Sequence, residues 1–167
     1  DRTKSRGLGD VYKRQGVEHE KFLFNKNNLK RIEYSQIIKI FEILVNKGWE
    51  LQSENGKVIG LKRDDQKITT EPGFQYELSG APYKNIHLVC SENSSHFNEL
   101  KEVFKKTSIT TSSIAYDPFN RLEDIPKSPK ARYKIMTSEM PKGGKLSLDM
   151  MYKTAGIQIN YDYTSEK

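Results

Sequence analysis

The chain is short of cysteine, histidine and long apolar runs. Cys90 is the only cysteine among 167 residues, which excludes an internal disulfide and fits a compartment that keeps thiols reduced. We therefore expect a cytoplasmic protein. No apolar run approaches the ~20 residues that a membrane-spanning helix needs, and the polar N-terminal segment has no signal-peptide pattern, so we expect no membrane partner. His87 and His96 share no metal-ligand spacing, and we interpret both as surface or hydrogen-bonded helix residues.

The basic excess is small and unevenly placed. The formal net charge is +6, and residues 1–15 carry half of it. Residues 6–15 also resemble translated sequencing-adapter read-through, so we expect residues 1–15 to be a non-native, disordered extension. The other basic residues are scattered rather than clustered, whereas a nucleic-acid-binding module needs them on one face. We therefore expect no nucleic-acid partner, although this class stays as an alternative.

The apolar periodicity predicts one α+β domain with an antiparallel meander. Asn55-Gly56 is a strong hairpin signal. Cys90 falls on the predicted apolar stripe of the long helix, where we expect an inert, buried side chain. The predicted strands are 16–24, 49–52, 58–62, 68–70, 74–78, 108–115 and 152–163; the predicted helices begin at Ser35 (as N-cap, ending at Gly48), after Pro82 (to Phe104) and at Pro129 (to Met140).

Two short strands carry paired polar side chains. Because side chains alternate along a strand, Glu18 and Glu20 share one face of the first strand, and Gln75 and Glu77 share one face of another. Carboxylates gathered in this way on neighbouring strands would form an oxygen-rich pocket of the kind that Mg²⁺ prefers. The residues alone leave a second interpretation open, in which both faces are simply solvated.

Several segments resemble, in order, the plant and proteobacterial type of glutamate–cysteine ligase. The resemblance extends over residues 16–167 and implies that they form the N-terminal part of that enzyme's catalytic domain. The segments that carry it are GVEHEKF (16–22), EPGFQYELSGAP (71–82), RYKIM (132–136), MPK (140–142), LDMM (148–151) and QINYD (158–162).

The resemblance implies a fold and a reaction. The fold is glutamine-synthetase-like, with the active site on the concave face of a curved antiparallel sheet and helices on the outer face. The reaction uses ATP to join L-glutamate to L-cysteine through a γ-glutamyl phosphate, which gives γ-glutamylcysteine in the first step of glutathione biosynthesis. The substrates are small molecules, and we expect the fragment alone to be inactive. A ligase with a different amine acceptor, or an inactive remnant, remains an alternative.

The resemblance also assigns site residues. Bringing an anionic phosphate to a carboxylate requires cations, and carboxylate-bound Mg²⁺ supplies them. By resemblance, the Mg²⁺ ligands are Glu18, Glu20, Glu71 and Glu77, and the substrate-binding residues are Arg132 (as anion clamp), Gln158 and Asn160.

The chain departs from the family pattern at a few positions. Phe74 replaces the second glycine of Glu-Pro-Gly-Gly-Gln, and Ala155-Gly156 replaces Cys-Thr. Thr137 stands where arginine is common, which puts a second cationic contact in doubt.

Overall fold

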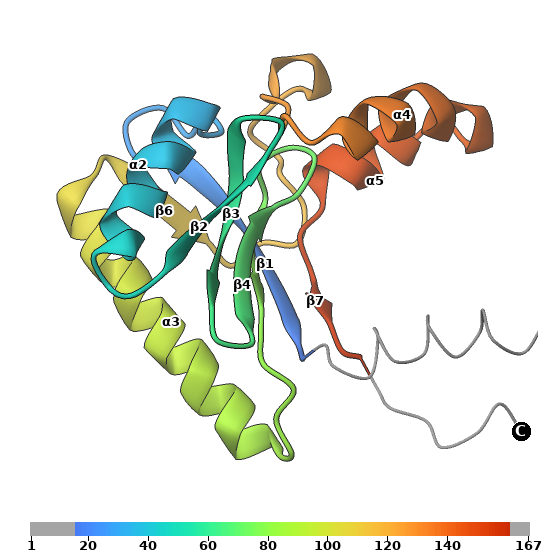
Figure 1. Ribbon diagram of the computed structural model, residues 1–167. Coiled ribbons are helices and arrows are strands. Elements are labelled where there is room, and N and C mark those ends of the chain that lie inside the picture. The colour runs from blue at the N-terminus through green and yellow to red at the C-terminus, as the bar shows by residue number, and fades with distance from the viewer. Residues whose placement is uncertain (1–15, 161–167) are drawn as a thin grey trace, which may run out of the picture.

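The computed structural model describes residues 16–160. The predicted extension over residues 1–15 and the end of the predicted last strand lie outside this range. The described elements, in chain order, are β1 (Glu18–Asn25), α2 (Tyr34–Val45), β2 (Glu50–Glu54), β3 (Lys57–Arg63), β4 (Gln66–Thr70), β5 (Tyr76–Ser79), α3 (Ile86–Lys106), β6 (Ile109–Ser112), the 3-10 turn η1 (Leu122–Asp124), α4 (Ala131–Glu139), the 3-10 turn η2 (Met140–Gly143), α5 (Ser147–Lys153) and β7 (Ile157–Gln158) (Figure 1).

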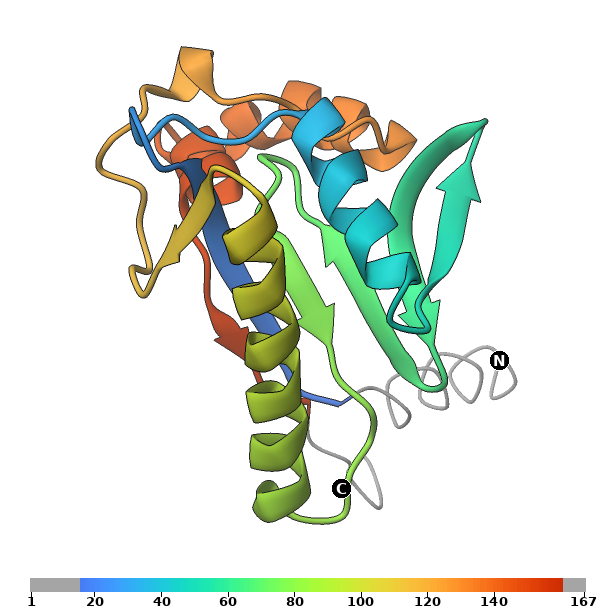
Figure 2. The same ribbon diagram turned by 90° about the vertical axis from the view of Figure 1, so that its left-hand side faces the viewer.

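The strands of this range form one open antiparallel sheet, which confirms the α+β class and the predicted meander. The order across the sheet is β2-β3-β4-β5-β1-β6, and β7 also pairs with β1. Helices α2 and α3 cover one face (Figure 2), while α4 and α5 lie at one end of the sheet. The hairpin between β2 and β3 turns at Asn55 (φ 50°) and Gly56 (φ 74°), the left-handed conformations that an Asn-Gly turn favours.

The main core lies between the sheet and its two covering helices. Tyr76 and Leu78 of β5 are fully buried there, as the alternation of the sequence predicts. Helix α2 begins two residues earlier than expected, because Glu33 rather than Ser35 is its N-cap and exchanges hydrogen bonds with Gln36 in a capping box.

The predicted apolar stripe of α3 is wrong in its first half. Cys90 is exposed, as is Ile86, because the first turns of α3 extend beyond the strands (Figure 2). Where the helix does reach the sheet, it buries His96 instead. The sequence could not show where along the helix contact with the sheet begins.

The predicted long final strand is also wrong. Helix α5 occupies 147–153, and only Ile157 and Gln158 pair with β1. The pairing is short because β6 already pairs with Phe22–Asn25, so the free edge of β1 is limited to its start. As a result the apolar side chain of Ile157 is two-thirds exposed, at 66%.

Phe74 occupies a position that suits glycine. Its φ of 56° is left-handed, yet its ring is buried in the main core. We expect Phe74→Ala to lower the free energy of unfolding by about 3–5 kcal/mol. Phe74→Gly should be about 1 kcal/mol more stable than Phe74→Ala, because glycine adopts positive φ without strain. Urea denaturation of both variants measures the difference.

Phe22 is the matched control for this comparison. Its ring is also fully buried, but its backbone is an ordinary strand within β1. There alanine should be the more stable replacement, because glycine in a strand loses more conformational entropy on folding. The same order of stability at both positions would contradict the role assigned to φ.

Candidate functional site

The strand register gathers carboxylates on the face of the sheet opposite α2 and α3. Glu20 lies directly across from Glu77, and Glu18 lies across from Ser79. Their neighbours Tyr76 and Leu78 point into the helix-covered core, so the three carboxylates point to the other face. Alternation in the sequence could predict which face of its own strand each carboxylate lies on. Only the pairing of β1 with β5 makes the three carboxylates neighbours.

Glu71 joins this group from the turn between β4 and β5. Burial and, after it, the neighbouring carboxylates of Glu77, Glu71 and Glu20 raise the pKa of Glu18 to about 7. Burial also raises the pKa of Glu20. The hydrogen bond from the Gly156 amide lowers this pKa, and the negative charges of Glu71 and Glu77 raise it further. These shifts have the direction expected for crowded carboxylates without a counter-ion.

Hydrogen bonds orient two of these carboxylates on the open face. Glu77 Oε1 accepts from the Thr69 hydroxyl at 3.1 Å and from the Ser79 hydroxyl at 2.7 Å. Glu20 Oε2 accepts from the Gly156 amide at 2.8 Å. Both carboxylates retain lone pairs that these donors do not use.

Arg132 lies next to the Glu71 carboxylate at the start of α4. Its Nη2 is 3.5 Å from Glu71 Oε1, and the Arg132 side chain is 63% exposed. Tyr133 links the two, since its hydroxyl donates to Glu71 at 2.9 Å and accepts from Arg132 at 2.8 Å. The guanidinium therefore has donors left over for an external anion.

The two predicted residues near the C-terminal end of the described range are placed differently. Gln158 is exposed and lies opposite Glu18 in the β1–β7 ladder, so it shares the carboxylate face. Asn160 donates to the Gly16 carbonyl at 2.9 Å and accepts from Gln158 at 3.1 Å. Its amide is thus engaged in holding the start of β1.

Two hollows border the carboxylate face. One, of about 420 Å³, is lined by Glu18, Glu20 and Gln158 together with segment 154–157. The other, of about 180 Å³, is lined by Glu20, Glu71 and Gln75 and has a wall of methionines, namely Met136, Met140, Met150 and Met151. From the sequence we interpret Met136 and Met140 as packing residues; their place beside two carboxylates depends on how α4 and α5 meet.

Alternation along the chain puts Gln75 on the same face as Glu77, but Gln75 has a different role. Its side chain is buried, accepts from the Gly73 amide at 2.8 Å and donates to the carbonyls of Met151 and Thr154 at 3.0 and 2.9 Å. It therefore fastens the end of α5 to the turn that follows Glu71.

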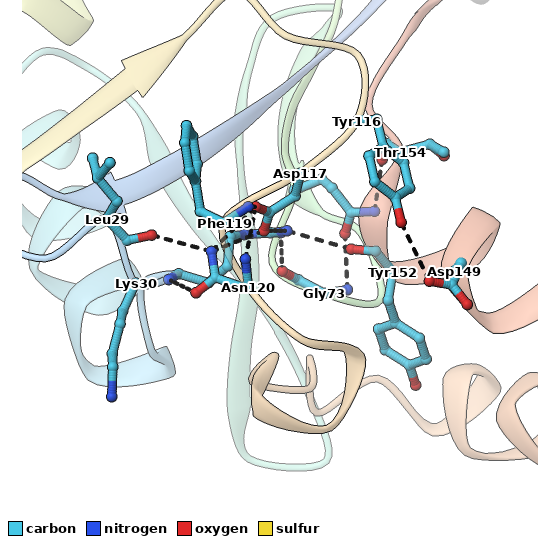
Figure 3. Close-up of polar contacts among 12 residues, drawn as sticks. Leu29, Lys30, Gly73, Tyr116, Asp117, Phe119, Asn120, Asp149, Tyr152 and Thr154 are labelled. Carbon is cyan, nitrogen blue, oxygen red and sulfur yellow. Dashed lines mark hydrogen bonds and ion pairs between the residues drawn. The ribbon is translucent and has the colours of Figure 1, made fainter.

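A second fastening, shown in Figure 3, has no signal in the sequence. The side chains of Arg31 and Asp117 are fully buried and paired at 3.4 Å; Asp117, Gly73 and Tyr152 are labelled in the figure. Arg31 also donates to the carbonyls of Gly73 and Tyr152, and its guanidinium lies 4.4 Å from the centre of the Phe22 ring. This cation joins the Pro-Gly turn, α5 and the loop before η1, and thereby holds the backbone next to Glu71.

The raised pKa of Glu18 predicts a pH effect on stability. The folded chain keeps the Glu18 proton up to about pH 7, whereas the unfolded chain releases it near its ordinary pKa. Stability should therefore fall as the pH rises between these values. Glu18→Gln should remove part of this loss, about 1 kcal/mol after allowance for solvent screening of a half-exposed carboxyl.

Urea denaturation of the metal-free chain at pH 5 and pH 8 measures this effect. Glu50→Gln is the control, since Glu50 lies exposed on the edge strand β2. The inference that burial and the neighbouring carboxylates raise the pKa of Glu18 is wrong if Glu18→Gln leaves the pH dependence unchanged.

Comparison with known proteins places this chain among ligases. Residues 14–167 match the model of Glutamate-cysteine ligase family 2 (GCS2). The chain is similar to chloroplastic glutamate–cysteine ligases of Arabidopsis thaliana (45% identity over 154 residues) and Brassica juncea (44% over 154), each match covering 92% of this chain and 30% of the relative. It is also 44% identical over 155 residues to ligase A of Oryza sativa subsp. japonica, covering 92% of this chain and 32% of that protein. The chain thus spans about a third of the length of these relatives.

The names of these relatives contradict the cytoplasmic location expected above, because each is named as chloroplastic. A single cysteine and the lack of long apolar runs suit any compartment with reduced thiols, so composition could not separate the two locations. Among residues 16–160, no helix has the length and apolar character needed to cross a bilayer.

The family model and the relatives agree with the resemblance seen in the motifs. The chain belongs to glutamate-cysteine ligase family 2.

Proposed function

We propose that residues 16–167 are the N-terminal part of a catalytic domain that joins L-glutamate to L-cysteine at the expense of ATP. The observation that carries this proposal is the shared face of Glu18, Glu20 and Glu77 beside Glu71. In this proposal the sheet belongs to a glutamine-synthetase-like fold, its carboxylate face is the concave one, and residues 1–15 are a non-native extension.

The donor chemistry of this face fits Mg²⁺. All four proposed ligands, Glu18, Glu20, Glu71 and Glu77, offer carboxylate oxygen, which this ion prefers. In residues 16–160 no three acidic, histidine or cysteine side chains are already close enough to bind one ion. The side chains must therefore rotate toward a shared ion, and the repulsion among the carboxylates, which after burial raises the pKa of Glu18, favours such a move. When bound, Mg²⁺ neutralises and orients the phosphates.

The chain's own residues then perform four tasks. Arg132 holds an anionic group of the substrate next to Glu71, using the guanidinium donors that Tyr133 leaves free. Gln158 offers its amide to substrate or nucleotide from the strand opposite Glu18, and Asn160 keeps that strand against Gly16. The carboxylates repel any unneutralised anion, so phosphoryl transfer from ATP to the γ-carboxylate proceeds only in a charge-balanced site.

The methionine-walled hollow is the proposed place for the cysteine side chain. At about 180 Å³ it is small, and it combines Glu20 and Glu71 with four thioethers. Thioethers are soft and polarisable and pack well against sulfur and short apolar groups. The amine of such an acceptor would lie beside the carboxylate face, where the acyl phosphate forms.

A chimera tests the proposed function. Residues 16–160 replace the matching segment of the Arabidopsis relative, and phosphate release is measured with ATP, Mg²⁺ and both amino acids. We expect release that depends on glutamate and cysteine together, and none from the 167-residue chain alone, because one wall cannot exclude water from an acyl phosphate. A chimera that is folded but inert would contradict the proposal, and one that prefers another amine would change the acceptor.

A further inference from the structure

Another cavity lies against the helix-covered side of β1 and shares Glu20 and residues 155–157 with the larger hollow beside the carboxylates. It has a volume of about 460 Å³ and lies between β1, α3 and the segments that lead out of β6 and into β7. His19 and Lys21 line it, and both share the face of Leu78 and Tyr76, their partners across the β1–β5 ladder. The lining residues that matter below are His19, Lys21, Asn93, Phe97, Ile114 and Ile157.

Lys21 is a buried cation without an acidic partner in residues 16–160. Its side chain is only 9% exposed, and none of the ion pairs in this range involves it. Its Nζ has one long hydrogen bond, 3.4 Å to the His19 carbonyl, and lies 5.0 Å from the centre of the Phe97 ring. Glu20 also borders the cavity, but its side chain leaves β1 on the face opposite to that of Lys21. An unpaired ammonium is costly to bury.

Other polar atoms around Lys21 also lack partners. Within the described range, His19 Nε2 and Asn93 Oδ1 are buried without a hydrogen bond. Behind them the Tyr76 hydroxyl and both ring nitrogens of His96 are equally unpartnered, with the two rings stacked at 5.6 Å. Buried polar groups are nearly always bonded to protein, water or ligand, so the His19 and Asn93 atoms that line the cavity suit a polar ligand.

The chemistry of the lining selects the class of that occupant. One ammonium, one imidazole and one side-chain amide can bind a single anionic group, and the amide can turn either its donor or its acceptor inward. Phe97, Ile114 and Ile157 form an apolar wall beside them. We propose that this cavity binds a small monocarboxylate with an apolar chain, its carboxylate on Lys21 and its chain against Phe97. Its binding groups Lys21 and His19 lie on the face of β1 opposite to Glu18 and Glu20 of the proposed ligase site.

Hexanoate is a suitable probe, and NMR titration of the isotope-labelled 167-residue chain measures its binding. We expect saturable shifts at Lys21, Asn93 and Phe97 at roughly millimolar hexanoate, since so small a ligand makes few contacts. Hexanol, which has the chain but no charge, should bind at least about tenfold more weakly, because a charge-assisted hydrogen bond is lost.

Lys21→Met keeps the length of the side chain and removes its charge. This variant should fold at least as stably as the parent chain, since it removes an unpaired buried cation, yet lose hexanoate affinity by about tenfold or more. Lys39→Met, on the exposed face of α2, should bind as the parent does. The proposal is overturned if hexanoate causes no shifts at these residues, if hexanol binds equally well, or if Lys21→Met retains full affinity.

Discussion

Glu77→Gln in the chimeric ligase should lower the turnover number by about 100-fold or more, because one charge of the proposed metal site is lost. The change should leave the fold intact. Glutamine has the same shape and keeps an acceptor oxygen for the Thr69 and Ser79 hydroxyls that bind Glu77 Oε1. The Mg²⁺ concentration for half-maximal activity should rise in parallel, which a simple packing defect would not cause.

Two measurements make this result decisive. Urea denaturation should show a free energy of unfolding close to that of the parent chimera, and Glu50→Gln on the exposed edge strand should retain full turnover. A Glu77→Gln chimera with normal turnover and unchanged Mg²⁺ dependence would exclude Glu77 as a metal ligand, whatever its position on the sheet.

Arg31→Met should lower the free energy of unfolding by about 3–5 kcal/mol. Arg31 and Asp117 are both fully buried, so removal of the cation leaves an uncompensated carboxylate in the interior. The carbonyls of Gly73 and Tyr152 also lose their donor. Urea denaturation of the 167-residue chain measures the loss.

The exposed pair Arg121–Glu123 provides the matched control. Its side chains are 81% and 59% exposed, so Arg121→Met should change stability by less than about 0.5 kcal/mol. The double variant Arg31→Met/Asp117→Asn should recover part of the loss, because no buried charge remains unpaired. If Arg31→Met unfolds at the same urea concentration as Arg121→Met, the buried pair does not hold this region together.

Local patterns alone determined much of the sheet. Alternation put Glu18 and Glu20 on one face of β1 and separated Glu77 from the apolar Tyr76 and Leu78 beside it, and Asn55-Gly56 fixed a hairpin. These inferences succeed because a strand's period of two and the left-handed preference of an Asn-Gly turn depend only on neighbouring residues. The ordered motifs likewise identified the family without any coordinates.

Other features needed the tertiary structure. Cys90 is exposed and His96 buried because α3 meets the sheet along only part of its length. The final strand is short because β6 takes most of the free edge of β1. The partners Arg31 and Asp117, and the unpaired Lys21, come from segments whose distance in sequence gives no sign of their contact. A sequence records each residue's local preference, but which buried charges meet or stay alone is decided only when distant segments pack together.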